Sequence, residues 1–232
     1  QQQKPTVTGL ADGGWVVSWM SNDGQDGSEW AVKGQRYLEN GTPAGGEFQI
    51  NSYTSSSQFA PEVTSLSDGS FVVVWMSNGQ DGSSWGVYGQ RFDGFGGAIG
   101  SEFQVNTYTH FEQSVPTITA LEDGGWLITW ISDQQDGSSW GLFGQRYAAD
   151  GSQVSNEFQI NTTNDGEQFV GTVAGLNDGG WVVVWRTYQQ DGSGYGLHAQ
   201  RYSSQGQPLG VEFLVNTTTE LDQISPEVTG LS

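Results

Sequence analysis

A unit of 55 residues recurs four times along the chain and restricts the folds open to it more than any other feature does. An aspartate opens a predicted turn in each unit, with one residue inserted in the first: Asp12, Asp68, Asp123 and Asp178. Such a period is typical of propellers, solenoids and arrays. We divide a single repeat domain, 1–232, into repeats at approximately 2–57, 58–112, 113–167 and 168–222. Residues 223–232 repeat only the first strand of a unit.

Each repeat contains four runs that resemble β-strands. In the second repeat they lie at 61–66, 71–75, 86–92 and 102–106. The first run alternates polar and apolar residues, whereas the second, FVVVW, is apolar at both parities and is therefore expected to be buried on both faces. Asp-Gly pairs between these two runs are typical of tight hairpin turns. Each repeat is thus predicted to form a four-stranded antiparallel meander.

These features predict an all-β fold. A sheet whose second strand is buried on both faces needs a neighbour on each side, which the radial packing of a β-propeller supplies. We therefore expect a β-propeller of four 55-residue, four-stranded repeats plus an extra C-terminal strand; a linear array of β repeats is the alternative. The spare strand could close a ring, pair with a second copy in a homo-oligomer, or belong to a longer array.

Charge and composition exclude several classes of partner. The chain has 26 acidic and 7 basic residues, a net charge of −19. Proteins that bind nucleic acids gain most of their affinity from lysine and arginine side chains, so this composition excludes a nucleic-acid partner. The apolar runs are too short for a spanning helix, so no membrane insertion is expected. The chain has no cysteine, which excludes disulfides and thiolate metal sites. Its opening residues, QQQKPTV, suggest a processed protein or an excised segment.

A Gln-Asp-Gly-Ser loop follows the second strand of every repeat, and an aromatic residue follows the loop. The candidate ligand-binding residues are Asp26, Ser28, Trp30, Asp81, Ser83, Trp85, Asp136, Ser138, Trp140, Asp191, Ser193 and Tyr195. Each aspartate would accept a sugar hydroxyl, each serine would add a polar contact, and each ring would be a stacking platform. The competing interpretation is that Asp, Gly and Ser only form the turn and the rings pack beneath it.

The same loops are candidates for Ca²⁺, which takes about six to eight oxygen ligands. The candidate metal ligands are Asp26, Asp81, Asp136 and Asp191. Because one aspartate recurs per loop, carbonyl oxygens or water would have to complete the shell.

Some repeat positions hold an aromatic residue or an arginine in nearly every repeat, and we expect most of these residues to have a structural role. Two tryptophan positions in the second strand, such as Trp126 and Trp130, are expected to pack between sheets. Four arginines share one position: Arg36, Arg91, Arg146 and Arg201. We expect each to clamp a carboxylate of its own sheet. The candidate partners are the loop aspartate or the glutamate of the fourth strand, Glu47, Glu102, Glu157 or Glu212.

Catalytic motifs are weak in this sequence. No nucleophile elbow, zinc-binding helix motif or phosphate-binding loop is present. A single active site would be expected where the repeats differ, such as Glu29, Lys33, Arg186 or 110–112.

The set DGGWVVVW, QDGSxW, GxxGQRF and GxEFQVNT resembles tandem repeats of very large secreted or surface proteins of bacteria, which often accompany RTX-type calcium-binding repeats. The resemblance covers essentially the whole chain and implies an extracellular, bacterial-surface module. It implies no defined activity, and the nonapeptide calcium repeat itself is absent from this sequence.

From these observations we predict a non-enzymatic, lectin-like or adhesin module that binds cell-surface or matrix glycans at repeated shallow sites. One alternative is a structural spacer or self-associating module, and another is a carbohydrate-active enzyme. No cofactor other than Ca²⁺ is suggested.

Overall fold

In the computed structural model, residues 1–22, 24, 27, 29–164 and 166–231 are described, and they fold as two compact units. The units are 1–118 and 119–232, and the division falls within β9. The strands are β1 (Gln2–Gly9), β2 (Trp15–Ser21), β3 (Ala31–Tyr37), β4 (Phe48–Gln49), β5 (Gln58–Ser65), β6 (Phe71–Asn78), β7 (Trp85–Phe92), β8 (Ala98–Gln104), β9 (Gln113–Ala120), β10 (Trp126–Asp133), β11 (Trp140–Tyr147), β12 (Phe158–Gln159), β13 (Gln168–Gly175), β14 (Trp181–Tyr188), β15 (Tyr195–Tyr202) and β16 (Phe213–Leu214).

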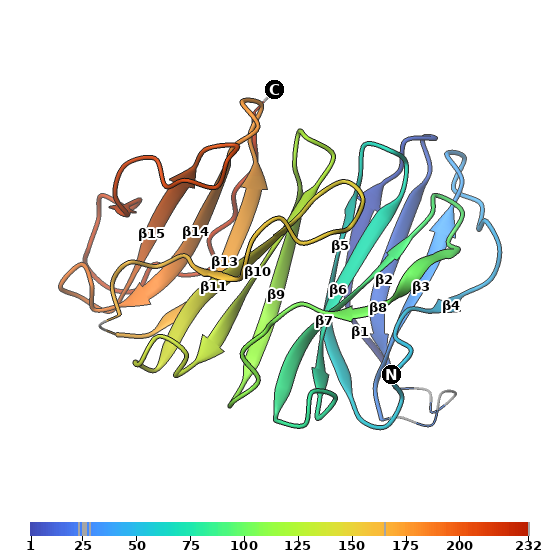
Figure 1. Cartoon of the computed structure of the whole chain (residues 1–232), viewed down its shortest axis with the longest axis horizontal. Coiled ribbons are helices and arrows are strands. Elements are labelled where there is room, and N and C mark those ends of the chain that lie inside the picture. Colours follow the sequence, from blue (N-terminus) through green and yellow to red (C-terminus); the bar gives the residue numbers. More distant parts are fainter. Residues whose placement is uncertain (23, 25–26, 28, 165, 232) are drawn as a thin grey trace. The chain divides into compact units, whose positions relative to one another are not determined.

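The described residues form four antiparallel sheets of four strands, one per repeat, and in each sheet the strands follow chain order (Figure 1). This confirms the predicted meander. The first two strands of each sheet are joined by the predicted Asp-Gly turn. Its glycine has a positive φ in every repeat, for example 85° at Gly69 and 82° at Gly124, which explains why glycine is placed there. Among the described residues no helix could span a membrane.

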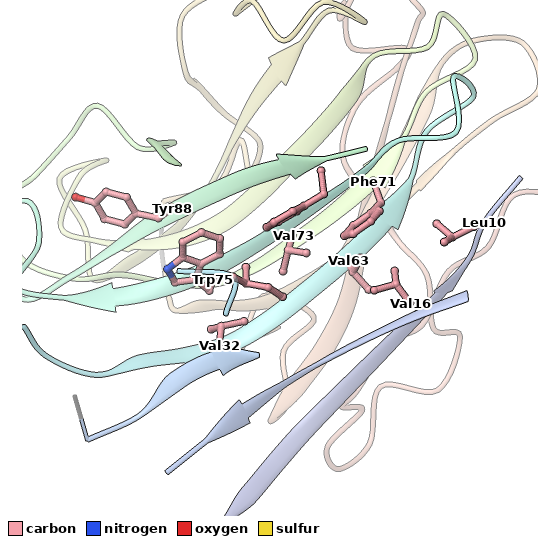
Figure 2. Close-up of a cluster of buried hydrophobic side chains, with 10 residues drawn as sticks. Leu10, Val16, Val32, Val63, Phe71, Val73, Trp75 and Tyr88 are labelled. Atoms are coloured by element: carbon pink, nitrogen blue, oxygen red, sulfur yellow. The ribbon is translucent and has the colours of Figure 1, made fainter. Parts of the chain in front are cut away.

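The core of the first unit lies between its two sheets. Leu10, Val16 and Val32 come from the first sheet, and they pack with residues of the second sheet that include Phe71 and Trp75 (Figure 2). Residues 71–75 of β6 are buried at both parities, as the sequence predicts for the second strand.

The tryptophans of the second strand also pack as predicted. Trp75, Trp130 and Trp185 are fully buried, whereas Trp19 of the first sheet is half-buried. At the other column, the ring of Trp126 stacks on that of Tyr147 with 5.4 Å between centroids. Rings at these positions therefore hold the second and third strands of each sheet together, in addition to filling the core.

Three of the first strands, β1, β5 and β13, contain a bulge that the sequence analysis did not predict. The pairing with the second strand shifts between Gln3 and Thr6 in β1, and the same shift recurs in β5 and β13. A residue other than glycine takes a left-handed conformation at the bulge, with φ of 51° at Lys4 and 50° at Ala60. Residues of this kind rarely adopt that conformation, so surrounding contacts must hold it in place.

The extra C-terminal strand is not formed as a strand. Within the described residues 223–231 no β-ladder is present, although this segment repeats the sequence of a first strand. A β-strand needs a hydrogen-bonded neighbour, and within the described residues this segment pairs with no second strand.

Candidate active site

The loops of interest lie at one end of each sheet. In a meander of antiparallel strands, the connection between the second and third strands is at the same end as the connection from the fourth strand to the next sheet. The Gln-Asp-Gly-Ser loops are therefore at the end where residues such as 50–57 lead from β4 to β5. Side chains from three parts of the repeat meet there.

The loop aspartate folds back onto its own repeat. Asp81 accepts a hydrogen bond from the backbone N–H of Ser83 at 3.0 Å through Oδ1. Its Oδ2 lies over Gly86, where an added Cβ would be 2.7 Å away. The same arrangement recurs at Asp136 over Gly141 and at Asp191. The turn-forming interpretation of the loop is therefore correct for one oxygen of each of these aspartates, and the other oxygen lies toward the third strand.

The Oδ2 atoms of the described loop aspartates have different surroundings. Asp191 Oδ2 is 3.5 Å from Asn216 Nδ2, and Asp136 Oδ2 is 3.3 Å from Gln159 Nε2. Asp81 Oδ2 is buried and accepts no hydrogen bond. A buried acceptor without a donor is costly in a folded protein, so this oxygen has an unused capacity to accept a hydrogen bond.

The glutamate of the fourth strand was predicted as a partner of arginine, and this prediction is wrong. Glu102 instead accepts hydrogen bonds from the side chain of Gln80 in the loop and from the backbone N–H of Ser52, the latter at 2.6 Å. In the second unit Glu212 accepts equivalent bonds from Gln190 and Thr162. The glutamate therefore ties the loop of its own sheet to the segment that follows the preceding sheet.

One position of the third strand differs in every repeat, and in the second, third and fourth repeats it lies near these carboxylates. It holds Lys33, Tyr88, Phe143 and His198, all of which are buried. An atom placed at the Cβ site of Gly86 would lie 2.7 Å from Asp81 Oδ2 and 3.3 Å from the ring of Tyr88, so the carboxylate and the phenol meet above this glycine.

The titratable members of this position respond to their surroundings. Burial, together with the carboxylates of Asp81 and Glu102 and with Tyr53, raises the pKa of the Tyr88 hydroxyl. Burial lowers the pKa of His198 below its ordinary 6.5, although Glu212 and Asp191 act in the opposite direction. The His198 Nδ1 atom is buried and has no hydrogen-bond partner. The sequence analysis named Lys33 among the residues that differ between repeats. It did not identify this position as a candidate site in all four repeats, because Tyr88 and Phe143 are ordinary residues for a β-strand.

The aromatic residues after the loops are half-buried. Trp30 and Trp85 lie on either side of Phe59, with ring centroids 5.6 Å and 5.3 Å from it. In the second unit Tyr195 packs against Phe169 and Tyr188. Each of these three rings therefore packs against aromatic rings of neighbouring strands and leaves part of its surface exposed. Trp140 is likewise half-buried.

The remaining predicted ligand-binding residues are at the loop tips. Ser83 donates a hydrogen bond to the carbonyl of Phe111 at 3.1 Å. Ser138 and Ser193 engage their loop aspartates through the backbone. Asp26 and Ser28 lie outside the described residues. In the described part of the chain no group of three or more His, Cys, Asp or Glu side chains is arranged to hold a metal ion, so calcium binding by Asp26, Asp81, Asp136 and Asp191 stays a prediction.

The other residues singled out where repeats differ are dispersed. Glu29 accepts a hydrogen bond from Ser57, and the carbonyl of His110 accepts one from Gln113. Arg186 lies between the rings of Phe169 and Tyr195, with its guanidinium carbon 5.1 Å and 5.0 Å from their centroids. These residues form no single cluster within either unit.

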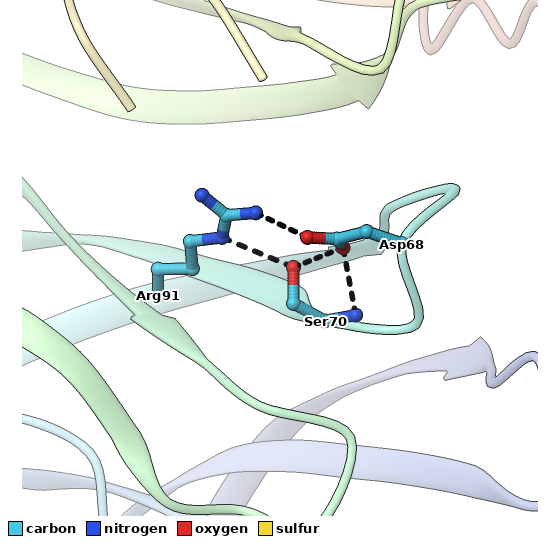
Figure 3. Close-up of polar contacts among 3 residues, drawn as sticks. All are labelled: Asp68, Ser70 and Arg91. Atoms are coloured by element: carbon cyan, nitrogen blue, oxygen red, sulfur yellow. Dashed lines mark hydrogen bonds and ion pairs between the residues drawn. The ribbon is translucent and has the colours of Figure 1, made fainter. Parts of the chain in front are cut away.

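The repeated arginines do form clamps within their sheets, as predicted, but the partner is the aspartate of the hairpin turn. Arg91 Nη2 is 2.6 Å from Asp68 Oδ2, and Arg91 Nε donates to Ser70 Oγ at 3.0 Å (Figure 3). Burial acts to raise the pKa of Asp68, but hydrogen bonds from Ser70 and the charge of Arg91 outweigh it, so that the pKa lies below 3.8. Arg36, Arg146 and Arg201 pair with Asp12, Asp123 and Asp178 in the same way.

The arginine clamps lie at the opposite end of each sheet from the loops. In the second unit a cavity of about 440 Å³ opens at that end, and it is lined by Arg146, Phe158, Trp181 and the turn 205–208 among others. Its lining residues include no carboxylate. In the first unit the hollow at the same end is lined by Asp12, Asp68 and Asp93, and the first two of these aspartates are held by the arginine clamps.

Comparisons with solved structures show that the fold is that of a β-propeller. A protein of unknown function from Dyadobacter fermentans matches with a TM-score of 0.66 and 12% identity, over 92% of this chain and 68% of that one. An α-L-arabinofuranosidase of Fusarium graminearum matches with a TM-score of 0.62 and 14% identity, over 93% and 66%. A sialidase from Streptococcus pneumoniae matches with a TM-score of 0.65 and 9% identity, over 94% and 52%.

The chain thus spans about two thirds of the arabinofuranosidase and about half of the sialidase. Comparisons with protein-family models and with curated proteins find no match. The structural matches overturn the prediction of a non-enzymatic, lectin-like or adhesin module, because the two named structures of known activity, an arabinofuranosidase and a sialidase, are enzymes that act on glycans. The carbohydrate-active enzyme, an alternative in the sequence analysis, fits these findings better.

Proposed function

We propose that the chain is part of an enzyme that hydrolyses glycosidic bonds, and that its active site is the cluster of Asp81, Tyr88 and Glu102. The observation that carries this proposal is the buried Oδ2 of Asp81, which lacks a hydrogen-bond donor and lies beside the Tyr88 ring. A similarity of fold to arabinofuranosidases and sialidases supports it.

Hydrolysis of a glycosidic bond breaks the bond between the anomeric carbon and the leaving oxygen and adds water across it. The anomeric carbon gains the water oxygen, and the leaving oxygen gains a proton. We assign the proton exchange with the substrate to Asp81, since no donor of the protein occupies its Oδ2. Glu102 is a positioning residue, because its oxygens already hold Gln80 and Ser52. The exposed parts of Trp85 and Trp30 supply surfaces on which sugar rings stack.

Charge favours a neutral glycan over a sialylated one. The chain carries 19 net negative charges, and four of its seven basic residues are committed to turn aspartates at the other end of the sheets. A substrate with a carboxylate of its own would therefore be repelled. We accordingly propose a neutral substrate such as an arabinose-containing polysaccharide. Glycan partners and an extracellular bacterial location stay predictions from the sequence.

The proposal is tested with a panel of neutral and acidic substrates: 4-nitrophenyl α-L-arabinofuranoside, linear arabinan and a fluorogenic sialoside. We expect turnover of a neutral substrate and a loss of about 10²- to 10⁴-fold in kcat for Asp81→Asn. The repeat provides a matched control, Asp136→Asn, because Asp136 holds the same turn but faces Phe143. An inert wild-type protein on every substrate, or equal losses in the two variants, would refute the assignment.

A further inference from the structure

The last sheet leaves uncovered a surface that is covered in the other sheets. In the first unit Phe48 of β4 packs against Phe92 of the next sheet, with 5.6 Å between ring centroids, and Ile50 is buried. In the second unit Phe158 packs in the same way against Tyr202, at 5.8 Å. The equivalent of Phe48 in the last sheet is Phe213, whose exposed fraction is 49%. Leu209, Leu214 and Val215 beside it are exposed as well.

The first sheet presents the complementary half of such a contact. Tyr37 occupies the position of Phe92 and Tyr202, and with Val17, Trp19 and Glu47 it lines a hollow of about 350 Å³. In the first unit Ser52 donates to Glu102, and in the second Thr162 donates to Glu212.

The corresponding residues at the two uncovered surfaces are Thr217 and Glu47, and both are exposed. Each half of the contact between successive sheets is therefore present on this chain.

The segment that follows the last sheet already has the shape of a first strand. Gln223 donates its backbone N–H to the carbonyl of Tyr195 at 2.7 Å, as Gln58 at the start of β5 does to Trp30. Ser225 has a φ of 58°, matching 51° at its equivalent Lys4 in the bulge of β1. A residue of this type holds a left-handed conformation only at a cost, yet Ser225 holds it without a paired strand.

The end of this segment is placed like a first strand too. An added Cβ on Gly230 would lie 2.4 Å from the carbonyl oxygen of Gly175, and an added Cβ on Gly175 lies 2.5 Å from that of Ala120. The side chain of Asn177 also donates to the carbonyl of Leu231. Leu231, however, is 83% exposed, whereas its equivalents Leu66 and Leu121 are buried. Within the described residues, no second strand covers this segment.

We propose that residues Gln223–Leu231 are a donor strand that completes the first sheet of a second copy of this chain. The donated segment replaces β1 of the second copy beside its β2. Its register is set by the pairing of β1, in which Val7 lies opposite Val17 and Gly9 opposite Trp15. Val228 is therefore placed opposite Val17 of the second copy, and Gly230 opposite Trp15. Adding a strand to a sheet edge in this way is a recurrent mode of recognition.

The exchange is favoured by burial. The donated strand makes the same backbone hydrogen bonds with β2 that β1 makes, so these bonds cancel between the free and associated states. The gain comes from Phe213, Val215 and Leu231, which are exposed in the free chain and are covered by the first sheet of the second copy. Because the two surfaces differ, the contact is heterologous and produces closed rings or open chains of copies.

A disulfide tests the pairing directly, since the natural chain has no cysteine. We expect Val17→Cys with Val228→Cys to form crosslinks between chains, seen as a ladder on a non-reducing gel. The matched control is Val7→Cys with Val17→Cys, which crosslinks β1 to β2 within one chain and is expected to abolish association until it is reduced. A Val17–Val228 crosslink found only in monomers would overturn the proposal of a second copy.

The oligomeric state provides the second test. By sedimentation over about a hundredfold range of concentration, the wild type is expected to associate, and Phe213→Asp to shift the midpoint by about tenfold or more. Phe111→Asp is the matched control, because Phe111 has the same 49% exposure and lies away from this surface. A wild type that is monomeric throughout, or equal effects of the two substitutions, would overturn the proposal. Circular dichroism of each variant verifies that it folds.

Discussion

An asparagine follows the fourth strand in each repeat and makes the same set of hydrogen bonds. The contribution of these bonds to the free energy of unfolding can therefore be compared between a buried and a half-buried site. In the second repeat Asn106 accepts the backbone N–H of Val87 at 2.7 Å and donates to the carbonyl of Tyr108 and to Gln113 Oε1. In the fourth repeat Asn216 makes the equivalent bonds, with Leu197, Thr218 and Gln223. Asn106 is buried and Asn216 is half-buried.

The expected losses follow from what each substitution leaves unpaired. Asn106→Ala removes the acceptor of the Val87 N–H and one donor to the Gln113 oxygen, both on fully buried residues, at about 1–3 kcal/mol each. We therefore expect Asn106→Ala to lower the free energy of unfolding by about 4 kcal/mol. In Asn216→Ala water reaches the freed groups, and only the net value of the bonds, about 1 kcal/mol, is lost.

Urea unfolding followed by tryptophan fluorescence measures both variants. With a slope of about 2 kcal/mol per M, the midpoint should fall by about 2 M in Asn106→Ala and by about 0.5 M in Asn216→Ala. Equal shifts in the two variants would show that burial does not set the value of this network.

Two further predictions concern the candidate site and its rings. Because the pKa of His198 is lowered in the folded state, its contribution to stability is complete above pH 6.5 and is lost as the pH falls through the folded pKa; His198→Phe, which copies Phe143, should remove this dependence in thermal melts between about pH 4 and 8. A slope that persists in the variant would assign the dependence to other groups. Trp75→Ala should cost about 3–5 kcal/mol of stability because its ring is fully buried, whereas half-buried Trp85→Ala should cost about 2 kcal/mol or less in the same denaturation assay. A larger loss at Trp85 would make that ring a core residue.

The strands could be predicted from sequence because their signals are local. Asp68-Gly69 fixes a hairpin turn, and the apolar run at 71–75 fixes a strand buried on both faces. The bulge at Ala60 could not be predicted, since alanine is not a residue that favours a left-handed conformation. The fifth first strand was predicted from a true repeat, but a strand also requires a partner, and residues 223–231 pair with no strand among the described residues.

The site was harder to predict, because its side chains meet only in three dimensions. The periodicity of Arg91 and Glu102 indicated a role for each but not which carboxylate each would contact. Arg91 reaches Asp68 because the first hairpin turn and the end of the third strand lie at the same end of the sheet. Glu102 reaches Ser52, whose neighbourhood depends on how successive sheets pack. Neither contact can be predicted from the spacing of these residues along the sequence.

The varying position of the third strand has a consequence for how such a protein can acquire new chemistry. Lysine, tyrosine, phenylalanine and histidine occupy equivalent places at residues 33, 88, 143 and 198, at the same register relative to the second strand. In each sheet the side chain at this position can thus be exchanged independently, because the other three sheets keep their own residues and the fold is preserved. In a chain built this way, a reactive side chain can be introduced in one repeat while the equivalent positions of the other three repeats stay unchanged.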